Sequence, residues 1–210
     1  MFDIDGTLIE SMDFDSACYL EAVESVTGLK IDSDWSNYRH VTDSGILLEV
    51  IERYSLASRK QQIMAETKQL FIEKVASYIN QNGVDRISGS AEFIDELKGN
   101  PKVVTAFATG GWRETAQLKL RSAGIEFSGS VLSSSSEHSQ RTEIMKFAER
   151  NSTGNRYSSI TYFGDGDWDK VASQQLGYQF IRIGKVIDGE TCFKDFSDSK
   201  AILSAIGVSS

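Results

Sequence analysis

Two aspartates one residue apart open the sequence, in the segment MFDIDGTLIES. Because side chains alternate along an extended backbone, Asp3 and Asp5 point to the same side of a strand end. Carboxylates held this close repel each other unless a cation lies between them or one of them is protonated. The pair therefore predicts a divalent metal, proton-transfer chemistry, or both.

A second acidic group follows a later apolar run, in the segment SSITYFGDGDWD. Its members are Asp165, Asp167 and Asp169. Hard oxygen ligands at this density suit Mg²⁺, which is bound by a few carboxylates and retains several water molecules. If this group lies near the first pair, the sequence predicts a magnesium site.

A glycine pair follows a predicted strand, in the segment FATGGWRE. Thr109 supplies a hydroxyl, and Gly110 and Gly111 precede a predicted helix. Backbone N–H groups at a glycine-rich helix start bind phosphate well, and the helix dipole favours the negative charge. A carboxylate beside a metal-bound phosphate can attack phosphorus, and a second carboxylate can transfer the proton of the leaving alcohol.

The second half of the chain alternates between strand-like and helix-like segments. The apolar runs predict strands over 102–109, 129–134, 158–165 and 178–184, and the intervening periodicity predicts helices over 112–124, 141–151, 168–177 and 198–207. This order is typical of a parallel sheet with helices on both faces, in which ligands bind beyond the carboxyl ends of the strands. We therefore expect Asp3, Asp5, Thr109 and Asp165 to be neighbours in space.

Residues 13–82 have a helical pattern nearly throughout. The apolar spacing predicts helices within 14–28, 44–57 and 59–83, and Gly28 and Gly83 are good stop signals. An all-helical stretch between the first aspartate pair and the glycine pair indicates an insertion into the α/β part.

The whole chain has the composition of a globular protein, with 210 residues, 40% of them hydrophobic and 25% charged. A net charge of -8 argues against nucleic acid or an anionic membrane as a partner. No apolar run approaches the length of a membrane span and no signal peptide is recognised, so we expect a cytoplasmic protein. Cys18 and Cys192 are isolated and are expected to be reduced thiols.

The motifs FDIDGTL, ATGG and YFGDGDWD, in this order and spacing, resemble the haloacid dehalogenase-like hydrolases. The resemblance implies an α/β fold, with a Rossmann-like doubly wound parallel sheet formed by residues 1–12 and 84–210. Residues 13–83 resemble the inserted all-helical C1 cap of the family, which closes over the site and selects the substrate. Asp5 places the chain with the phosphatases and phosphomutases, such as phosphoglycolate phosphatase and β-phosphoglucomutase, because the dehalogenases lack an acid there.

The family pattern also implies roles for individual residues. Asp3 falls on the nucleophile, and Asp5 on the general acid/base whose backbone carbonyl binds Mg²⁺. Thr109 falls on the residue that hydrogen-bonds the phosphoryl group, together with Gly110 and Gly111. Asp165 would complete the Mg²⁺ ligands, and Asp169 would be a further supporting acid.

Two departures from the family stand out. The third motif is a lysine that neutralises phosphate and nucleophile, but this chain has SQRTEIM at that place. Arg141 is the expected substitute, the alternative being a surface arginine, and Lys146 lies one turn deeper in the helix. The first strand is the second departure: only Met1 and Phe2 precede the first aspartate, so we expect a chain that starts late.

In the helical stretch, the polar and aromatic loop WSNYRHVTDSG resembles a substrate-reading loop. One hypothesis is that Arg39 or His40 contacts the leaving group of the substrate. The alternative is plain helix capping by Thr42 or Asp43. Trp168 is expected to pack beneath the last motif without touching substrate.

Together these features predict a Mg²⁺-dependent hydrolase of a small phosphomonoester, acting through an aspartyl-phosphate on Asp3. The sequence does not name the substrate and leaves a sugar phosphate, a phosphoglycolate-like acid and a nucleotide open. The alternatives are a phosphomutase of the same superfamily and a catalytically inactive binding protein with this fold.

Overall fold

A parallel sheet forms the centre of the molecule in the computed structural model, which describes residues 1–152 and 157–208. Its named strands are β1 (Ala106–Ala108), β2 (Val131–Ser133), β3 (Thr161–Gly164), β4 (Gln179–Ile183) and β5 (Cys192–Phe193). β1 pairs with β2, and β3 with β4 and then β5, every pair being parallel. The fold is therefore the α/β class that the sequence predicts.

The first residues of the chain join the two groups of strands. Phe2 bridges Phe107 of β1 and Phe163 of β3, both in parallel. The amide of Phe2 donates to Ala106 O at 2.9 Å, and the amide of Asp3 donates to Phe163 O at 2.9 Å. Although short, this segment is hydrogen-bonded on both sides and occupies the middle of the sheet.

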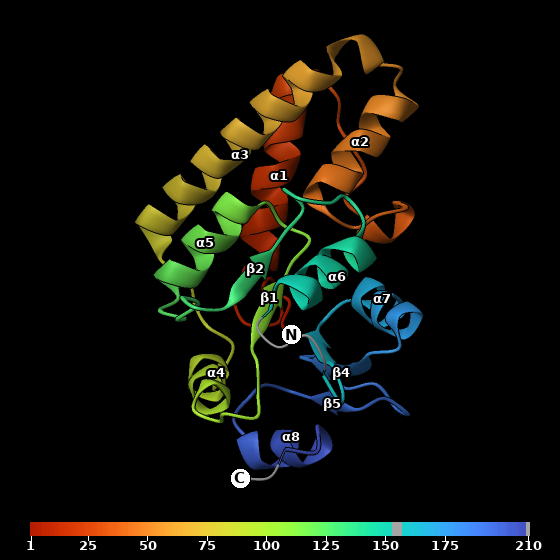
Figure 1. The fold of residues 1–210 in the computed structure, drawn as a ribbon. Coiled ribbons are helices and arrows are strands. Elements are labelled where there is room, and N and C mark those ends of the chain that lie inside the picture. Colours follow the sequence, from red (N-terminus) through yellow and green to blue (C-terminus); the bar gives the residue numbers. More distant parts are fainter. Residues whose placement is uncertain (153–156, 209–210) are drawn as a thin grey trace.

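Helices cover both faces of the sheet and form a separate group at one end (Figure 1). Three belong to the separate group and five to the sheet region. They are α1 (Met12–Thr27), α2 (Asp43–Arg53), α3 (Lys60–Asn82), α4 (Ser90–Lys98), α5 (Arg113–Ser122), α6 (Arg141–Asn151), α7 (Asp167–Leu176) and α8 (Ser199–Ala205), with 3₁₀ turns at Trp35–Asn37 and Ala57–Arg59.

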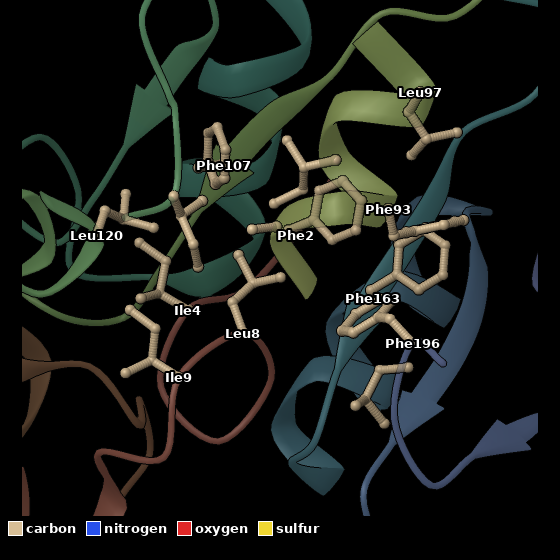
Figure 2. Close-up of a cluster of buried hydrophobic side chains, with 14 of the residues drawn as sticks. Phe2, Ile4, Leu8, Ile9, Phe93, Leu97, Phe107, Leu120, Phe163 and Phe196 are labelled. Carbon is tan, nitrogen blue, oxygen red and sulfur yellow. The ribbon is translucent and has the colours of Figure 1, made fainter. Parts of the chain in front are cut away.

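Alternate strand residues face two different apolar clusters, as the period of two requires. Phe107 and Phe163 join a cluster with side chains of α4, α5 and α8, whereas Ala106, Ala108 and Tyr162 face α6 and α7. Phe2 lies in the first cluster, with its ring stacked on Phe163 at a centroid distance of 4.7 Å (Figure 2). The central segment is thus held by packing as well as by hydrogen bonds.

The helices α1, α2 and α3 enclose an apolar cluster of their own. One member comes from outside: Trp112, the residue before α5, has its ring 6.0 Å from Tyr19 and 5.7 Å from Phe71. The chain leaves and re-enters the sheet region at one place, where Ile9 and Arg86 form an antiparallel bridge. The residues between Ile9 and Arg86 therefore form an insertion that packs on the sheet region through a shared tryptophan.

The sequence pattern predicts most of these elements but neither α4, which lies between Gly89 and Gly99, nor the short strand β5. The observed strands are also shorter than the apolar runs that predict them. Within the described residues, no helix combines the length and the apolar character that crossing a bilayer requires.

Truncating the central aromatic side chain tests how much the first segment contributes. We expect Phe2→Ala to lower the free energy of unfolding by about 3–5 kcal/mol, because a fully buried ring is replaced by a cavity. Val171→Ala, at a position 49% exposed on α7, should change it by less than about 0.5 kcal/mol. Urea denaturation measures the free energy of unfolding of both variants. Equal losses in the two variants would mean that the first segment of the chain is not part of the cooperative core.

Candidate active site

One pocket lies at the carboxyl ends of the central strands. Asp3 and Asp5 follow the middle segment, Thr109 follows β1, Asp165 follows β3 and Arg141 begins α6; all five line this pocket. Parallel strands bring their carboxyl ends to the same edge, which explains why residues so distant in sequence meet here. The structure therefore brings together the main site residues that the sequence predicts.

Three carboxylates form the most acidic part of the pocket. Asp3, Asp165 and Asp169 each offer an oxygen within 4.8 Å of the other two. The Oδ1 atoms of all three are buried and have no hydrogen-bond partner among the described residues. Buried oxygens without donors are what a bound cation would satisfy, so this donor set fits a hard divalent metal such as Mg²⁺.

The same crowding changes the protonation of these acids. Burial, followed by the charge of Asp169, raises the pKa of Asp3 to about 7. Burial and the charge of Asp3 raise the pKa of Asp165 to about 7, and burial raises that of Asp169 to about 6. Without a cation, the cluster therefore retains protons near neutral pH.

Arg141 is the cation nearest to this cluster. Its Nη1 lies 2.8 Å from Oδ1 of Asp169 and 3.4 Å from Oδ1 of Asp3, so it forms ion pairs with both acids. Its Nη2 donates to Val41 O at 3.0 Å. Lys146, which lies farther along this helix, pairs instead with Glu143 outside the pocket. Of the two, Arg141 alone lines the pocket.

Asp5 is held by Ser11, two residues after Ile9, and by Lys119, which the sequence alone did not single out. Its Oδ1 accepts hydrogen bonds from the Ser11 hydroxyl and from Nζ of Lys119, which is 2.5 Å away. Lys119 is fully buried and also donates to Oδ1 of Asp15 at 2.7 Å. Burial alone would lower its pKa, but Asp15 and Asp5 raise it above the ordinary lysine value.

A signal for Lys119 was present in the sequence. It lies three residues after Ala116 and next to Leu120, both fully buried, so it falls on the apolar face of α5. A lysine on the buried face of a helix needs an acidic partner. The sequence did not reveal which acid that would be.

The glycine pair leaves room for Arg141. A Cβ on Gly110 would collide with Nη2 of Arg141 and would lie 2.9 Å from Val41 O. A Cβ on Gly111 would meet nothing closer than 3.6 Å. The Gly111 amide donates to Oγ1 of Thr109 at 3.1 Å, which leaves the hydroxyl hydrogen of Thr109 available to a ligand.

The insertion forms the roof of the pocket. Its lining residues include Asp15, Tyr19, Trp35 and Asp43. The Asp43 amide donates to Gly110 O at 2.9 Å, and its Oδ2 accepts from the Trp112 amide at 2.7 Å. The roof is thus hydrogen-bonded directly to the glycine-rich loop.

Two sequence-based expectations about side chains need correction. Arg39 and His40 do not line the pocket, and the side chain of Arg39 is 63% exposed and pairs with Glu52. Thr42 caps the start of α2, which was the alternative interpretation of this loop. Trp168 is half-buried and packs against Gly166 of the loop as expected, but it also lines the pocket.

Comparison with known proteins agrees with this geometry. The family model for haloacid dehalogenase-like hydrolases matches residues 1–183. A hydrolase from Pseudomonas syringae has a TM-score of 0.74 at 18% identity, covering 99% of this chain and 98% of its own. A predicted phosphoglycolate phosphatase from Haemophilus somnus 129PT has a TM-score of 0.67 at 16% identity, covering 96% and 95%.

A third solved structure was determined with a metal. The HAD-hydrolase YfnB from Bacillus subtilis, bound to magnesium, has a TM-score of 0.57 at 14% identity, covering 97% of this chain and 96% of its own. No curated protein sequence matches this chain significantly.

The glycine pair offers a matched test of the close packing around Arg141. We expect Gly110→Ala to reduce the free energy of unfolding by about 1–3 kcal/mol, because Arg141 or the Val41 carbonyl must move. Gly111→Ala meets only ordinary contacts and should cost less than about 1 kcal/mol. Urea denaturation gives the free energy of unfolding of both variants. A larger loss of this free energy in Gly111→Ala than in Gly110→Ala would contradict the close packing around Gly110.

The acidic cluster predicts a pH dependence of stability in the metal-free protein. The pKa values of Asp3 and Asp165 are raised to about 7, so the folded state binds more protons than the unfolded state above pH ~4. Their contribution to stability is present at low pH and is lost as the pH rises through about 7. With EDTA present, we expect the melting temperature to fall from pH ~5 to ~8.

The Asp165→Asn variant is the decisive comparison. Its melting temperature should fall less steeply with rising pH than that of the wild type. The buried amino group of Met1, whose pKa is lowered to about 5, acts in the opposite direction in both proteins. Identical slopes in the two proteins would mean that the cluster does not control this pH dependence.

Proposed function

This chain belongs to the haloacid dehalogenase-like hydrolases, and we propose that it hydrolyses small phosphomonoesters through a phosphoryl-enzyme on Asp3. The observation that carries the proposal is the pair of acids in one pocket. Asp3 faces the acidic cluster and Arg141, while Asp5, two residues later, is held apart by Ser11 and Lys119. Two carboxylates in different surroundings can perform two different tasks.

In the first step, a carboxylate oxygen of Asp3 attacks phosphorus and the bond to the leaving oxygen breaks. Asp5 donates a proton to the leaving alcohol. In the second step, Asp5 takes a proton from water, the water oxygen attacks phosphorus, and the carboxylate of Asp3 is released with phosphate. Water is the only reactant that these two steps need besides the phosphomonoester.

Other side chains of this pocket would bind and orient the phosphoryl group. The guanidinium of Arg141 is charged at every accessible pH and matches phosphoryl oxygens in shape. The hydroxyl of Thr109 and the backbone of Gly110 and Gly111 add donors at the start of α5. Preorganised donors of this kind stabilise the charge of the transition state in a site shielded from water.

The donor set supports Mg²⁺ as the cofactor. Asp3 and Asp165 would bind it through their carboxylates and Asp5 through its backbone carbonyl, with Asp169 supporting Asp165 and Arg141. When bound, Mg²⁺ supplies positive charge that neutralises the carboxylates and polarises the phosphoryl oxygens. The magnesium bound to YfnB is consistent with this assignment.

The insertion is proposed to act as the cap, with residues 13–83 as the cap and residues 1–12 and 84–210 as the core. Two observations support this division. The chain crosses between the parts at adjacent positions, Ile9 and Arg86, and the insertion has its own apolar cluster. Its residues form the roof of the pocket, where they would exclude water and contact the leaving group.

Release of phosphate from p-nitrophenyl phosphate tests the proposal. The wild-type protein should be active with Mg²⁺ and inactive with EDTA, and Asp3→Asn should reduce activity to background because the nucleophile is lost. Asp5→Asn should reduce kcat by about 10²–10⁴-fold, as expected for a general acid–base.

Asp13→Asn is the matched control, because Asp13 is exposed on α1 and the change in charge is the same. It should retain wild-type activity. A folded wild-type protein that releases no phosphate with Mg²⁺, or an Asp3→Asn variant that remains active, would contradict the proposed mechanism.

A further inference from the structure

A buried arginine lies beside the loop that carries Asp165. Arg182 is near the carboxyl end of β4, opposite Gly164 of β3 in the parallel register, and its side chain is 3% exposed. The loop between β3 and α7 consists of Asp165 and Gly166. Arg182 therefore borders this loop from the neighbouring strand, although it belongs to none of the three sequence motifs.

The guanidinium of Arg182 binds the loop and the start of the helix that follows it. Its Nη1 donates to the backbone carbonyl of Asp165, and its Nη2 donates to Oδ1 of Asp167 at 2.6 Å. Its Nε donates to Oε2 of Glu190 at 2.8 Å, and the other oxygen of Glu190 accepts from Nζ of Lys170 at 2.7 Å. The planar fork of the arginine thus connects the loop to α7 and to the segment between β4 and β5.

Stability alone does not account for a cation at this position. Nη2 of Arg182 is bonded to Asp167, the first residue of α7, and the N-terminus of a helix carries a partial positive charge that repels a cation. Burial adds a desolvation cost, and replacing a buried ion pair by an apolar side chain is often neutral or stabilising. The donors of Arg182 are therefore better explained by the groups that they hold in place.

The peptide unit between Asp165 and Gly166 is fixed at both of its polar ends. Its carbonyl oxygen accepts from Arg182, and its N–H donates to Oδ2 of Asp169 at 3.1 Å. The carbonyl and the N–H of a trans peptide point in opposite directions, so the two supports act from opposite sides. Oδ1 of Asp165 itself has no hydrogen-bond partner among the described residues, so the orientation of this carboxylate depends on the fixed peptide.

We infer that Arg182 is a positioning residue for the Mg²⁺ site, which fixes this peptide so that the Asp165 carboxylate stays beside those of Asp3 and Asp169. The inference deepens the proposed function and rests on its assignment of Asp165 as a metal ligand. Arg182 does not line the pocket and acts through Asp165. Groups that orient a metal ligand without touching the metal typically change metal affinity about 10–100-fold when they are removed.

Calorimetric titration of the Arg182→Met variant with MgCl₂, without substrate, tests this role. Methionine leaves the Asp165 carbonyl without its donor, so we expect the Kd for Mg²⁺ to rise about 10–100-fold. The sign of the change is decisive, because the loss of a positive charge near a cation site would by itself tighten Mg²⁺ binding. A merely structural role would lower the melting temperature of the metal-free protein without raising this Kd.

Lys170→Met is the matched control. It removes the same charge from the same network, but Nζ of Lys170 pairs with Glu190 instead of with the loop. Its Kd for Mg²⁺ should stay within about threefold of the wild-type value. A weakening as large as that in Arg182→Met would overturn the role of Arg182, because the effect would then come from the network as a whole.

Arg182→Lys retains the charge but replaces the fork by a single ammonium group, which cannot hold the Asp165 carbonyl and Asp167 in the same geometry. Its Kd for Mg²⁺ should lie between those of the wild type and Arg182→Met. If Arg182→Met does not fold, Arg182→Lys decides alone. Mg²⁺ binding as tight as that of the wild type would then overturn the inference.

The titration needs no turnover, which separates this inference from the proposed function. A folded wild-type protein that binds Mg²⁺ but releases no phosphate contradicts the phosphatase mechanism, and the comparison of Kd values still decides the role of Arg182. Unaltered Mg²⁺ binding in the Arg182 variants overturns the inference even if p-nitrophenyl phosphate is hydrolysed. A wild-type protein that binds no Mg²⁺ overturns it as well.

Discussion

Repulsion among buried carboxylates is the constraint on which the pocket depends. Asp3, Asp5, Asp15, Asp165 and Asp169 converge there, and two buried cations oppose them, each placed between two acids. Arg141 joins Asp3 to Asp169, and Lys119 joins Asp5 to Asp15. Removing one partner from such an arrangement leaves an uncompensated buried charge, which is far more costly than the pair is favourable. Each cation therefore fixes the place of two acids at once.

The two cations divide the acids into separate groups. Around Arg141, Oδ1 of Asp3 and of Asp165 accept no hydrogen bond among the described residues, which leaves capacity for a metal. Around Lys119, Oδ1 of Asp5 already accepts two hydrogen bonds, so this carboxylate is held in one orientation. Asp3 keeps an oxygen without a hydrogen-bond donor because its neighbouring cation is Arg141, whereas Oδ1 of Asp5 is occupied because its neighbouring cation is Lys119. Neighbouring positions on one strand end acquire distinct chemistry in this way.

Much of this could be predicted from the sequence because the information is local. Asp3, Thr109 and Asp165 each follow an apolar run, and parallel strands necessarily bring such positions to one edge. The partners of Lys119 could not be predicted, because they lie on the middle segment and on α1, more than 100 residues away in the chain. Arg39 shows the opposite difficulty: it lies four residues before Asp43 in the sequence, yet its side chain turns to Glu52 and solvent. The nine-residue helix α4 is not predicted, although its buried residues Phe93, Ile94 and Leu97 follow the helical spacing.

Trp112 has a consequence for how the two parts of the molecule can separate. It precedes a helix of the sheet region, but its ring is 2% exposed within the apolar cluster of the insertion. Any movement that lifts the insertion from the pocket must bring this indole into water, together with the faces of Tyr19 and Phe71 that cover it. Indole emission shifts to longer wavelength on hydration, so opening of the roof would shift the part of the protein's emission that comes from Trp112, the most deeply buried of its three tryptophans.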